Sequence, residues 1–300
     1  MNNQNIDQDS QRSGICNLCG RSDFRTIYDF QRYRLVACKD CYLHFLFPPI
    51  STSELKDIYS KEYYLSPDSN LYGYSDYRKD VDLIVYTSIR RFTELERSFP
   101  ARGLLLDAGC AHGYFLDVAR LHEWKTIGVE THADAVTHAV QRLGLDVRMG
   151  DLFQQRFPDN HFDVVTCWDL IEHLTDPQMF FREVNRILKP GGVFELTTPD
   201  IDSLPSRIMR RRWMGIKSRE HLFFFSKKTL GQYFQNNKFS IMSCRYTGKY
   251  VSRELFLDRL KYYSGFLGWV ASLIRPLLPD RFYVNPYDIL HVTARKQTDP

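Results

Sequence analysis

Residues 103–200 alternate short apolar runs with amphipathic stretches, and this alternation constrains the fold more than any other feature of the chain. The runs GLLLDAG, KTIGVE, LDVRMGDL, FDVVTCWD and VFELTTPD are typical of strands, and stretches such as HADAVTHAVQRL have helical periodicity. Buried apolar strands that alternate with helices form a parallel sheet covered on both faces. The sequence therefore predicts a doubly wound α/β domain.

Three acids stand at the ends of predicted strands: Asp107, Glu130 and Asp151. Ligands of such sheets bind at the carboxyl ends of the strands, and the turn from Gly109 to Gly113 lets the backbone approach a ligand closely. A carboxylate at Asp107 disfavours a pyrophosphate but suits an ammonium group, and the full G-x-G-x-x-G pattern is absent. An adenosine cofactor that carries an amino acid therefore fits better than a nicotinamide dinucleotide.

The segments LLDAGCAHGYFL, IGVE, GDLF, FDVVTCWDLIEHLTDP and RILKPGGVFELTTPD resemble consecutive motifs of class I S-adenosylmethionine-dependent methyltransferases. The pattern is most similar to a broad bacterial group with a Cys-x-x-Cys pair ahead of the domain and an H-x-x-x-F-S segment after it, here His221–Ser226. The resemblance is dense over residues 103–200 and looser from 14 to 296. It implies a Rossmann-like, mostly parallel sheet of seven strands whose last two form an antiparallel hairpin. Ala111 departs from the pattern, since it stands where the glycine loop often has a second glycine, so we expect a slightly shifted loop.

The resemblance also implies S-adenosylmethionine as the cofactor and assigns residues to its methionine and ribose parts. Asp107, Gly109, Cys110 and Gly113 would shape the methionine pocket. Glu130 would accept hydrogen bonds from both ribose hydroxyls.

Four further residues would complete the cofactor site. Asp151 would accept a hydrogen bond from the adenine amine, with Leu152 beside the ring. Trp168 and Asp169 follow the fourth strand and would border the methyl group.

Two histidines are candidates for catalysis, because a hydroxyl acceptor must lose a proton and histidine can take it at neutral pH. His173 and His221 should both lie on the rim where the strands end. For His173, capping a turn is an equal alternative. A further alternative is a divalent cation held by Asp169, Glu172 and His173, whose spacing resembles that in ubiquinone-pathway O-methyltransferases.

The N-terminal region has two matched cysteine pairs, Cys16-x-x-Cys19 and Cys38-x-x-Cys41. Four thiolates from two tight turns match tetrahedral zinc, and the spacing fits a zinc ribbon. All four ligands are protein groups, so the predicted zinc site is structural.

The segment after the fifth strand is basic: residues 207–219 carry six basic side chains and no acid. The net charge of the chain is +4, so the remaining residues sum to −2, and no general nucleic-acid surface is indicated. An apolar, aromatic helical insertion at about 249–287 separates the last two strands. We interpret it as an acceptor lid that rests on a membrane surface or recognises a lipid-linked anion; a packed helical hairpin with solvated arginines is the alternative.

These patterns divide the chain into a zinc-ribbon-like knuckle (14–47), a helical linker or cap (48–100) and an S-adenosylmethionine-binding domain (101–300). The linker is rich in tyrosines that line a pocket or pack the linker onto the domain. The predicted function is methyl transfer to a small-molecule, glycan or lipid-linked acceptor, most simply O-methylation. An RNA methyltransferase and a non-catalytic zinc-ribbon binding module are the alternatives, but the knuckle is only weakly basic and the cleft motifs are intact.

The N-terminus is polar and has no signal-peptide stretch, and the apolar run 262–274 is shorter than the roughly 20 residues of a membrane-spanning helix. We therefore expect a cytoplasmic protein, in which cysteines are more often metal ligands or core residues than disulfides.

Overall fold

The structure, a computed structural model, describes residues 14–50, 54, 80–217 and 220–298. The tyrosine-rich part of the linker lies outside the described residues. None of the described helices is long and apolar enough to cross a membrane.

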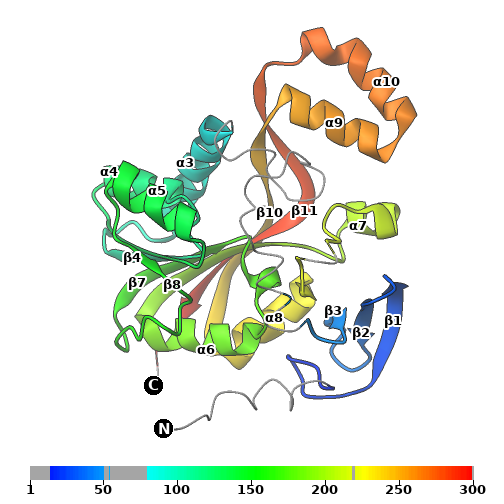
Figure 1. Ribbon diagram of the computed structural model, residues 1–300. Coiled ribbons are helices and arrows are strands. Elements are labelled where there is room, and N and C mark those ends of the chain that lie inside the picture. The colour runs from blue at the N-terminus through cyan, green and yellow to red at the C-terminus, as the bar shows by residue number, and fades with distance from the viewer. Residues whose placement is uncertain (1–13, 51–53, 55–79, 218–219, 299–300) are drawn as a thin grey trace.

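A mixed sheet of seven strands forms the centre of the molecule, in the order β10-β11-β8-β7-β4-β5-β6 (Figure 1). Its five parallel strands are β4 (Leu104–Ala108), β5 (Lys125–Glu130), β6 (Val147–Met149), β7 (Phe162–Trp168) and β8 (Leu188–Pro199). The long strands β10 (Phe239–Ser252) and β11 (Arg281–Lys296) are antiparallel to each other, and β11 is antiparallel to β8. This arrangement confirms the predicted doubly wound, mostly parallel sheet with an antiparallel hairpin at one edge.

Helices cover both faces of the sheet, above it and below it in the view of Figure 1. The upper helices are α3 (Val81–Ser98), α4 (Tyr114–Leu121) and α5 (Ala133–Leu143), and the lower ones are α6 (Pro177–Ile187) and α8 (Lys227–Asn236). Each face has its own apolar core: Phe92 and Phe115 belong to the upper one, and Phe181 and Phe234 to the lower one.

The N-terminal knuckle forms a second sheet in the order β1-β2-β3-β9. Its strands are β1 (Phe24–Asp29), β2 (Arg34–Cys38), β3 (His44–Phe47) and β9 (Phe223–Phe224). The fourth strand comes from the segment directly after His221, because His44 pairs with Phe224 and Phe45 with Phe223. The knuckle is therefore joined to the main domain through a strand, which its cysteine spacing does not reveal.

The paired strands β10 and β11 extend beyond the sheet and carry a helical arm at their far end (Figure 1). The arm consists of α9 (Arg253–Tyr263), α10 (Gly265–Ile274) and a short turn η3 (Arg275–Leu277). Because the strands stay paired as far as Ser252 and Arg281, the segment between them is 253–280, shorter at both ends than the expected insertion.

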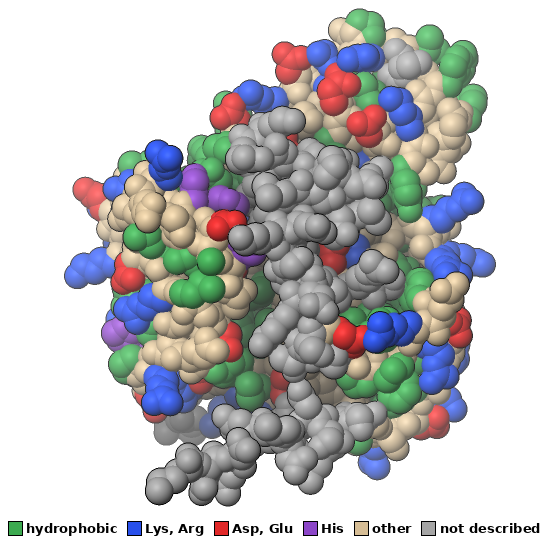
Figure 2. Space-filling model, viewed as in Figure 1, with side chains coloured by type: hydrophobic (Ala, Val, Ile, Leu, Met, Phe, Trp, Pro, Cys, Tyr) green, Lys and Arg blue, Asp and Glu red, His purple; other side chains and the backbone are tan. Residues whose placement is uncertain are grey.

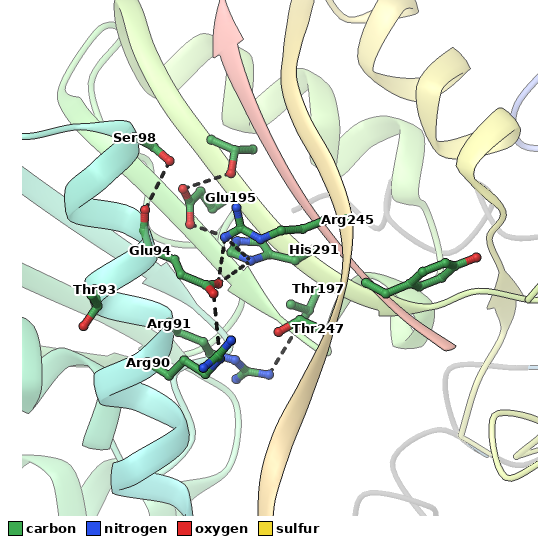
Figure 3. Close-up of polar contacts among 12 residues, drawn as sticks. Arg90, Arg91, Thr93, Glu94, Ser98, Glu195, Thr197, Arg245, Thr247 and His291 are labelled. Atoms are coloured by element: carbon green, nitrogen blue, oxygen red, sulfur yellow. Dashed lines mark hydrogen bonds and ion pairs between the residues drawn. The ribbon is translucent and has the colours of Figure 1, made fainter. Parts of the chain in front are cut away.

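A buried ion-pair network fastens α3 to the antiparallel edge of the sheet (Figure 3). The His291 ring lies between two carboxylates, with Nε2 3.1 Å from Glu195 Oε2 and Nδ1 3.1 Å from Glu94 Oε2. Arg245 on β10 also reaches Glu94, at 2.7 Å. Burial alone would lower the pKa of His291, but Glu195 and Glu94 raise it above its ordinary value and so favour the charged ring.

Candidate cofactor and acceptor site

One cavity of about 1100 Å³ opens at the carboxyl ends of the parallel strands. This volume is at the upper end for ligand pockets and is large enough for a cofactor together with an acceptor. Both candidate histidines line it, and so do eight of the nine residues predicted for the cofactor: Asp107, Gly109, Cys110, Glu130, Asp151, Leu152, Trp168 and Asp169.

Gly113 is the predicted cofactor residue that does not line the cavity. It precedes α4 with a φ of 84°, and a Cβ there would lie 2.7 Å from Leu145 Cδ1. This left-handed conformation and close contact favour glycine. Gly113 therefore shapes the loop by starting the helix, and not by touching the ligand space.

Asp107 is the penultimate residue of β4, lines the cavity and is almost completely buried. The Thr166 hydroxyl donates a hydrogen bond of 2.6 Å to its Oδ1. Burial raises the pKa of Asp107 to about 7, although this hydrogen bond and the charge of Arg91 act in the opposite direction. A buried acid of this kind gains most from a cationic ligand, because an ammonium would favour its charged form.

Glu130 ends β5 with its carboxylate held by three backbone amides. Ala111 donates to Oε2 at 2.9 Å, while Thr131 and His132 donate to Oε1 at 2.7 and 2.9 Å. The left-handed Ala111, with a φ of 47°, turns its amide toward this acid. The loop backbone at Ala111 thus supplies a donor that fixes the carboxylate facing the cavity.

The loop after β6 forms the next part of the wall. Asp151 accepts a 2.8 Å hydrogen bond from the Gln154 amide, which shapes the turn, and Leu152 is buried beside it. The acid at this turn can accept a hydrogen bond from the amine of an adenine ring, and the apolar side chain can contact the flat face of that ring.

Trp168 and Asp169 lie where β7 ends, against two cations that the sequence reading missed. Arg91 on α3 and Lys249 on β10 each lie 2.8 Å from Asp169 Oδ2. The Arg91 guanidinium also lies over the Trp168 ring, 4.8 Å from its centroid. Burial would raise the pKa of Asp169, but Lys249 and Arg91 hold it well below its usual range. Arg91 lies in the amphipathic helix α3 beside the buried Phe92, and nothing in that local pattern marks it as a partner of Asp169.

The end of the cavity predicted to take the acceptor, called the acceptor end below, contains a cluster of Glu172, His173 and His221. The candidate ligand atoms of these residues all lie within 4.8 Å of one another. The expected metal set of Asp169, Glu172 and His173 is not gathered, because Asp169 is occupied by Arg91 and Lys249. His221 takes its place in the cluster. Burial and the nearby Asp169 charge raise the pKa of Glu172 to about 8, which favours the neutral carboxyl at pH 7.

Backbone carbonyls fix the tautomers of both histidines. Nδ1 of His221 lies 2.9 Å from the Gly215 oxygen, and Nδ1 of His173 lies 3.0 Å from the Glu220 oxygen. A carbonyl can only accept, so Nδ1 carries the proton in each ring and Nε2 has the lone pair. Burial lowers the pKa of His173 to about 4 and that of His221 well below its ordinary value, so both rings are neutral.

The walls beyond these histidines are mostly apolar and come from α3, β10 and α9. The lining side chains from these elements include Leu83, Ile84, Val251, Leu255, Phe256 and Leu260. Lys217 and Arg259 add positive charge to the same region. Helix α9 of the arm is therefore a wall of the acceptor end.

The four predicted metal ligands of the knuckle are also gathered. Cys16 Sγ lies 3.4 Å from Cys41 Sγ, Cys19 Sγ lies 3.5 Å from Cys38 Sγ, and the four sulfurs lie within 4.8 Å of one another. Sulfurs around a tetrahedral zinc, bonded at about 2.3 Å, are about 3.8 Å apart. The four-cysteine cluster has the dimensions of a closed metal site.

Comparison with known proteins places this site in a family. A family model described as a methyltransferase domain matches residues 77–243, more than half of the chain. A Mycolicibacterium smegmatis protein named a probable S-adenosylmethionine-dependent methyltransferase is 38% identical over 97 residues, 32% of this chain and 38% of that protein. A Mycobacterium tuberculosis protein of the same name is 33% identical over 125 residues, 40% of this chain and 45% of that protein.

The ubiquinone biosynthesis O-methyltransferase of Coxiella burnetii is 27% identical over 114 residues, 36% of this chain and 49% of that protein. The matched segments span less than half the length of all three relatives. Among solved structures, an S-adenosylmethionine-dependent methyltransferase from Archaeoglobus fulgidus has a TM-score of 0.51 at 17% identity, covering 73% of this chain and 99% of that one. A Pyrococcus horikoshii protein has a TM-score of 0.51 at 18% identity, covering 79% and 99%.

The fold and the arrangement of acids at its strand ends define a protein of the class I S-adenosylmethionine methyltransferase type. The chain belongs to the methyltransferase domain family whose model it matches. The family expected from the sequence motifs is thereby confirmed.

Proposed function

We propose that the protein transfers a methyl group from S-adenosylmethionine to a hydroxyl of an apolar or lipid-linked small molecule. The observation that carries this proposal is a single cavity with two chemically different ends. Buried acids line one end, and neutral histidines among apolar side chains line the other. The name of the Coxiella relative, an O-methyltransferase, supports the same class of acceptor group.

S-adenosylmethionine supplies an electrophilic methyl group on a sulfonium, and the chain's task is to position it and the acceptor in line. Asp107 would bind the ammonium, and Glu130 the ribose hydroxyls with lone pairs that its three amide donors leave over. Asp151 and Leu152 would hold the adenine. Trp168 and Asp169, fixed by Arg91, would border the methyl group.

At the acceptor end, His221 Nε2 would take the hydroxyl proton. Its tautomer presents a lone pair there, and its depressed pKa keeps that lone pair available at neutral pH. A base of such low pKa takes up the proton only as the methyl transfer proceeds, so we expect the acceptor to be a phenol or another acidic hydroxyl. His173 would support the His221 ring by an edge-to-face contact with 4.7 Å between centroids.

The knuckle would bind one structural zinc ion through Cys16, Cys19, Cys38 and Cys41. Zinc would supply folding energy to the small sheet, whose own core is modest. Its contribution to the reaction would be indirect, through the pairing of β3 with β9 beside His221.

The test is calorimetry followed by a transfer assay. The protein should bind S-adenosylmethionine and its demethylated product, and should not bind NAD. It should then transfer a labelled methyl group to a phenol with a prenyl side chain better than to the same phenol without one. If the protein binds NAD and not S-adenosylmethionine, the proposed cofactor is wrong. If it transfers the methyl group equally to both phenols, the proposed preference for an apolar acceptor is wrong.

A further inference from the structure

Helix α10 carries an uncharged apolar face at the outermost part of the molecule. Phe266, Trp269, Leu273 and Leu277 recur at spacings of three and four residues, so they lie on one side of the helix and its following turn. Their exposed fractions are 68%, 60%, 59% and 82%. A contiguous exposed patch of this kind marks an interaction surface.

The opposite side of α10 is already used to pack against α9. Gly268 is buried there, and a Cβ at this position would lie 2.6 Å from Lys261 Cγ and 3.1 Å from Lys261 Cα. The glycine permits this close approach of the two helices. The apolar face, on the other side of α10 from Gly268, therefore points away from α9.

Positively charged side chains lie on the same side of the molecule, below the arm. Helix α7 (Leu204–Met209) and the turn η2 (Arg210–Arg212) expose Arg207, Arg210 and Arg212. No acid occurs between residues 203 and 217, although Arg207 lies 3.9 Å from Asp202 just before this stretch. Leu204 and Ile208 on α7 are exposed beside them. Figure 2 shows hydrophobic side chains at the tip of the arm and Lys or Arg side chains along the edge below it.

We propose that the apolar face of α10, together with the α7–η2 arginines, docks the protein onto an anionic phospholipid bilayer. An apolar helix face flanked by aromatic and cationic side chains is the composition that binds the headgroup region of a membrane. Arginines are attracted to anionic headgroups and can bond their phosphates with two parallel hydrogen bonds.

A bilayer fits this surface better than a second copy of the chain. The four side chains offer on the order of 500 Å², since an aromatic side chain buries about 150–250 Å². A stable protein interface needs about 800 Å² from each partner. The arginines on both copies would also repel each other across a symmetric contact, whereas anionic lipid complements them.

Docking of the arm would also explain how an apolar acceptor reaches the cavity, and this part of the inference rests on the proposed function. Helix α9 lies between the two surfaces: Lys261 contacts α10, while Leu255, Phe256 and Leu260 line the acceptor end. An acceptor dissolved in the bilayer would pass along α9 to His221 without crossing water.

Trp269 provides the readout, because Trp124, Trp168 and Trp213 are buried and Trp269 alone of the four tryptophans is exposed. Vesicles of phosphatidylcholine with about 30% phosphatidylglycerol should shift its fluorescence to the blue and carry the protein into the pellet. The F266E/L273E variant should bind these vesicles at least about tenfold more weakly. The matched control is Leu121→Glu, which changes an equally exposed leucine on α4.

The arginines are tested with R210E/R212E, which should lose the preference for anionic over neutral vesicles, while Arg142→Glu on α5 should keep it.

Docking is overturned if the wild type binds neither kind of vesicle, if F266E/L273E binds as well as the wild type, or if that variant instead abolishes a dimer. Calorimetry with S-adenosylmethionine separates this outcome from failure of the proposed function, because the variants should bind it normally. Once vesicle binding of the wild type is established, the F266E/L273E variant should have a higher apparent KM than the wild type for a prenylated phenol in vesicles, but the same apparent KM in detergent micelles. Equal apparent KM values of the two proteins in vesicles would overturn the delivery role of the arm.

Discussion

The ring of His221 lies edge-on against the ring of His173, with 4.7 Å between centroids and planes at 88°. The two residues are far apart in sequence and meet because the Leu222 amide donates a 2.7 Å hydrogen bond to the Glu172 carbonyl. The same segment continues into β9 and pairs with the knuckle. The acceptor end of the cavity is thus the meeting point of the sheet, the basic segment and the cysteine-rich knuckle.

The first prediction concerns the base. His221→Ala should lower turnover by about 100- to 10,000-fold while leaving S-adenosylmethionine affinity nearly unchanged, because general-base catalysis contributes about that much. The control His161→Ala changes a histidine at the opposite end of β7, before Phe162, and should have no effect on turnover.

The pH profile gives the same prediction a second readout. Since burial lowers the pKa of His221 well below its ordinary value, the base form dominates from pH 6 to 9. Protonation of His221 should therefore not lower the turnover of the wild type near pH 6.5. A wild-type acid limb at that pH that vanishes in His221→Ala would contradict the assignment.

The second prediction concerns cofactor binding and pH. Burial raises the pKa of Asp107 to about 7, so below pH 7 only a minority of the protein molecules carry an ionised Asp107. An ammonium-bearing ligand binds this ionised form. S-adenosylmethionine affinity should rise by about tenfold between pH 6 and 8, and binding at pH 6 should release protons. Calorimetry in two buffers of different ionisation enthalpy measures this release. Asp107→Asn should bind more weakly and lose the pH dependence; an unchanged dependence would contradict the role of Asp107.

The third prediction concerns the carboxylate of Glu130. Glu130→Gln removes the charge and sets an amide NH2 against at least one of the three backbone donors. Loss of charge-assisted hydrogen bonds costs about 1.5–3 kcal/mol, which corresponds to roughly 10- to 150-fold in affinity. Asp151→Asn, which keeps an acceptor oxygen for the Gln154 amide, should cost less. Equal affinities of wild type and Glu130→Gln would argue against ribose binding at this acid.

The fourth prediction concerns the knuckle. Elemental analysis should find about one zinc ion per chain, and Cys16→Ser with Cys38→Ser should release it. Because β3 pairs with β9 next to His221, the variant should lose turnover as well as order in residues 14–47, yet still bind S-adenosylmethionine. Cys244→Ser, which changes an exposed cysteine elsewhere, should retain both metal and turnover. Full turnover in a metal-free variant would separate the knuckle from the acceptor end.

The fifth prediction concerns stability. His291→Ala leaves Glu195 buried without its ion-pair partner, and breaking a buried pair in this way costs about 3–5 kcal/mol. The E195L/H291L double variant should lose less, because no charge is then stranded. Chemical denaturation at pH 7 compares the two, and equal losses would contradict the network.

The pH dependence of stability provides a check on His291 itself. Its pKa is raised in the folded state, so its stabilising contribution is fully present below the ordinary histidine value. That contribution should decline as the pH rises through the raised value. The decline should be absent in the double variant.

The sequence by itself determined the central sheet, the cofactor end of the cavity and the cysteine cluster. These features depend on local periodicity and short spacing: a strand, an acid and a glycine turn stand within Leu104–Gly113, and each cysteine pair stands within one turn. Neighbouring parallel strands then bring their carboxyl ends to one edge, so Asp107, Glu130 and Asp151 converge without further information.

The tertiary structure decided the acceptor end. Arg91 and Lys249 neutralise Asp169, and His221 joins Glu172 and His173, through contacts between residues 48 to 80 positions apart in sequence that no local pattern encodes. The pairing of β3 with β9, the exact limits of the arm and the burial that sets the pKa values have the same origin. Long-range packing and the exclusion of water depend on the whole fold, whereas periodicity and turn chemistry are already present in a short stretch of chain.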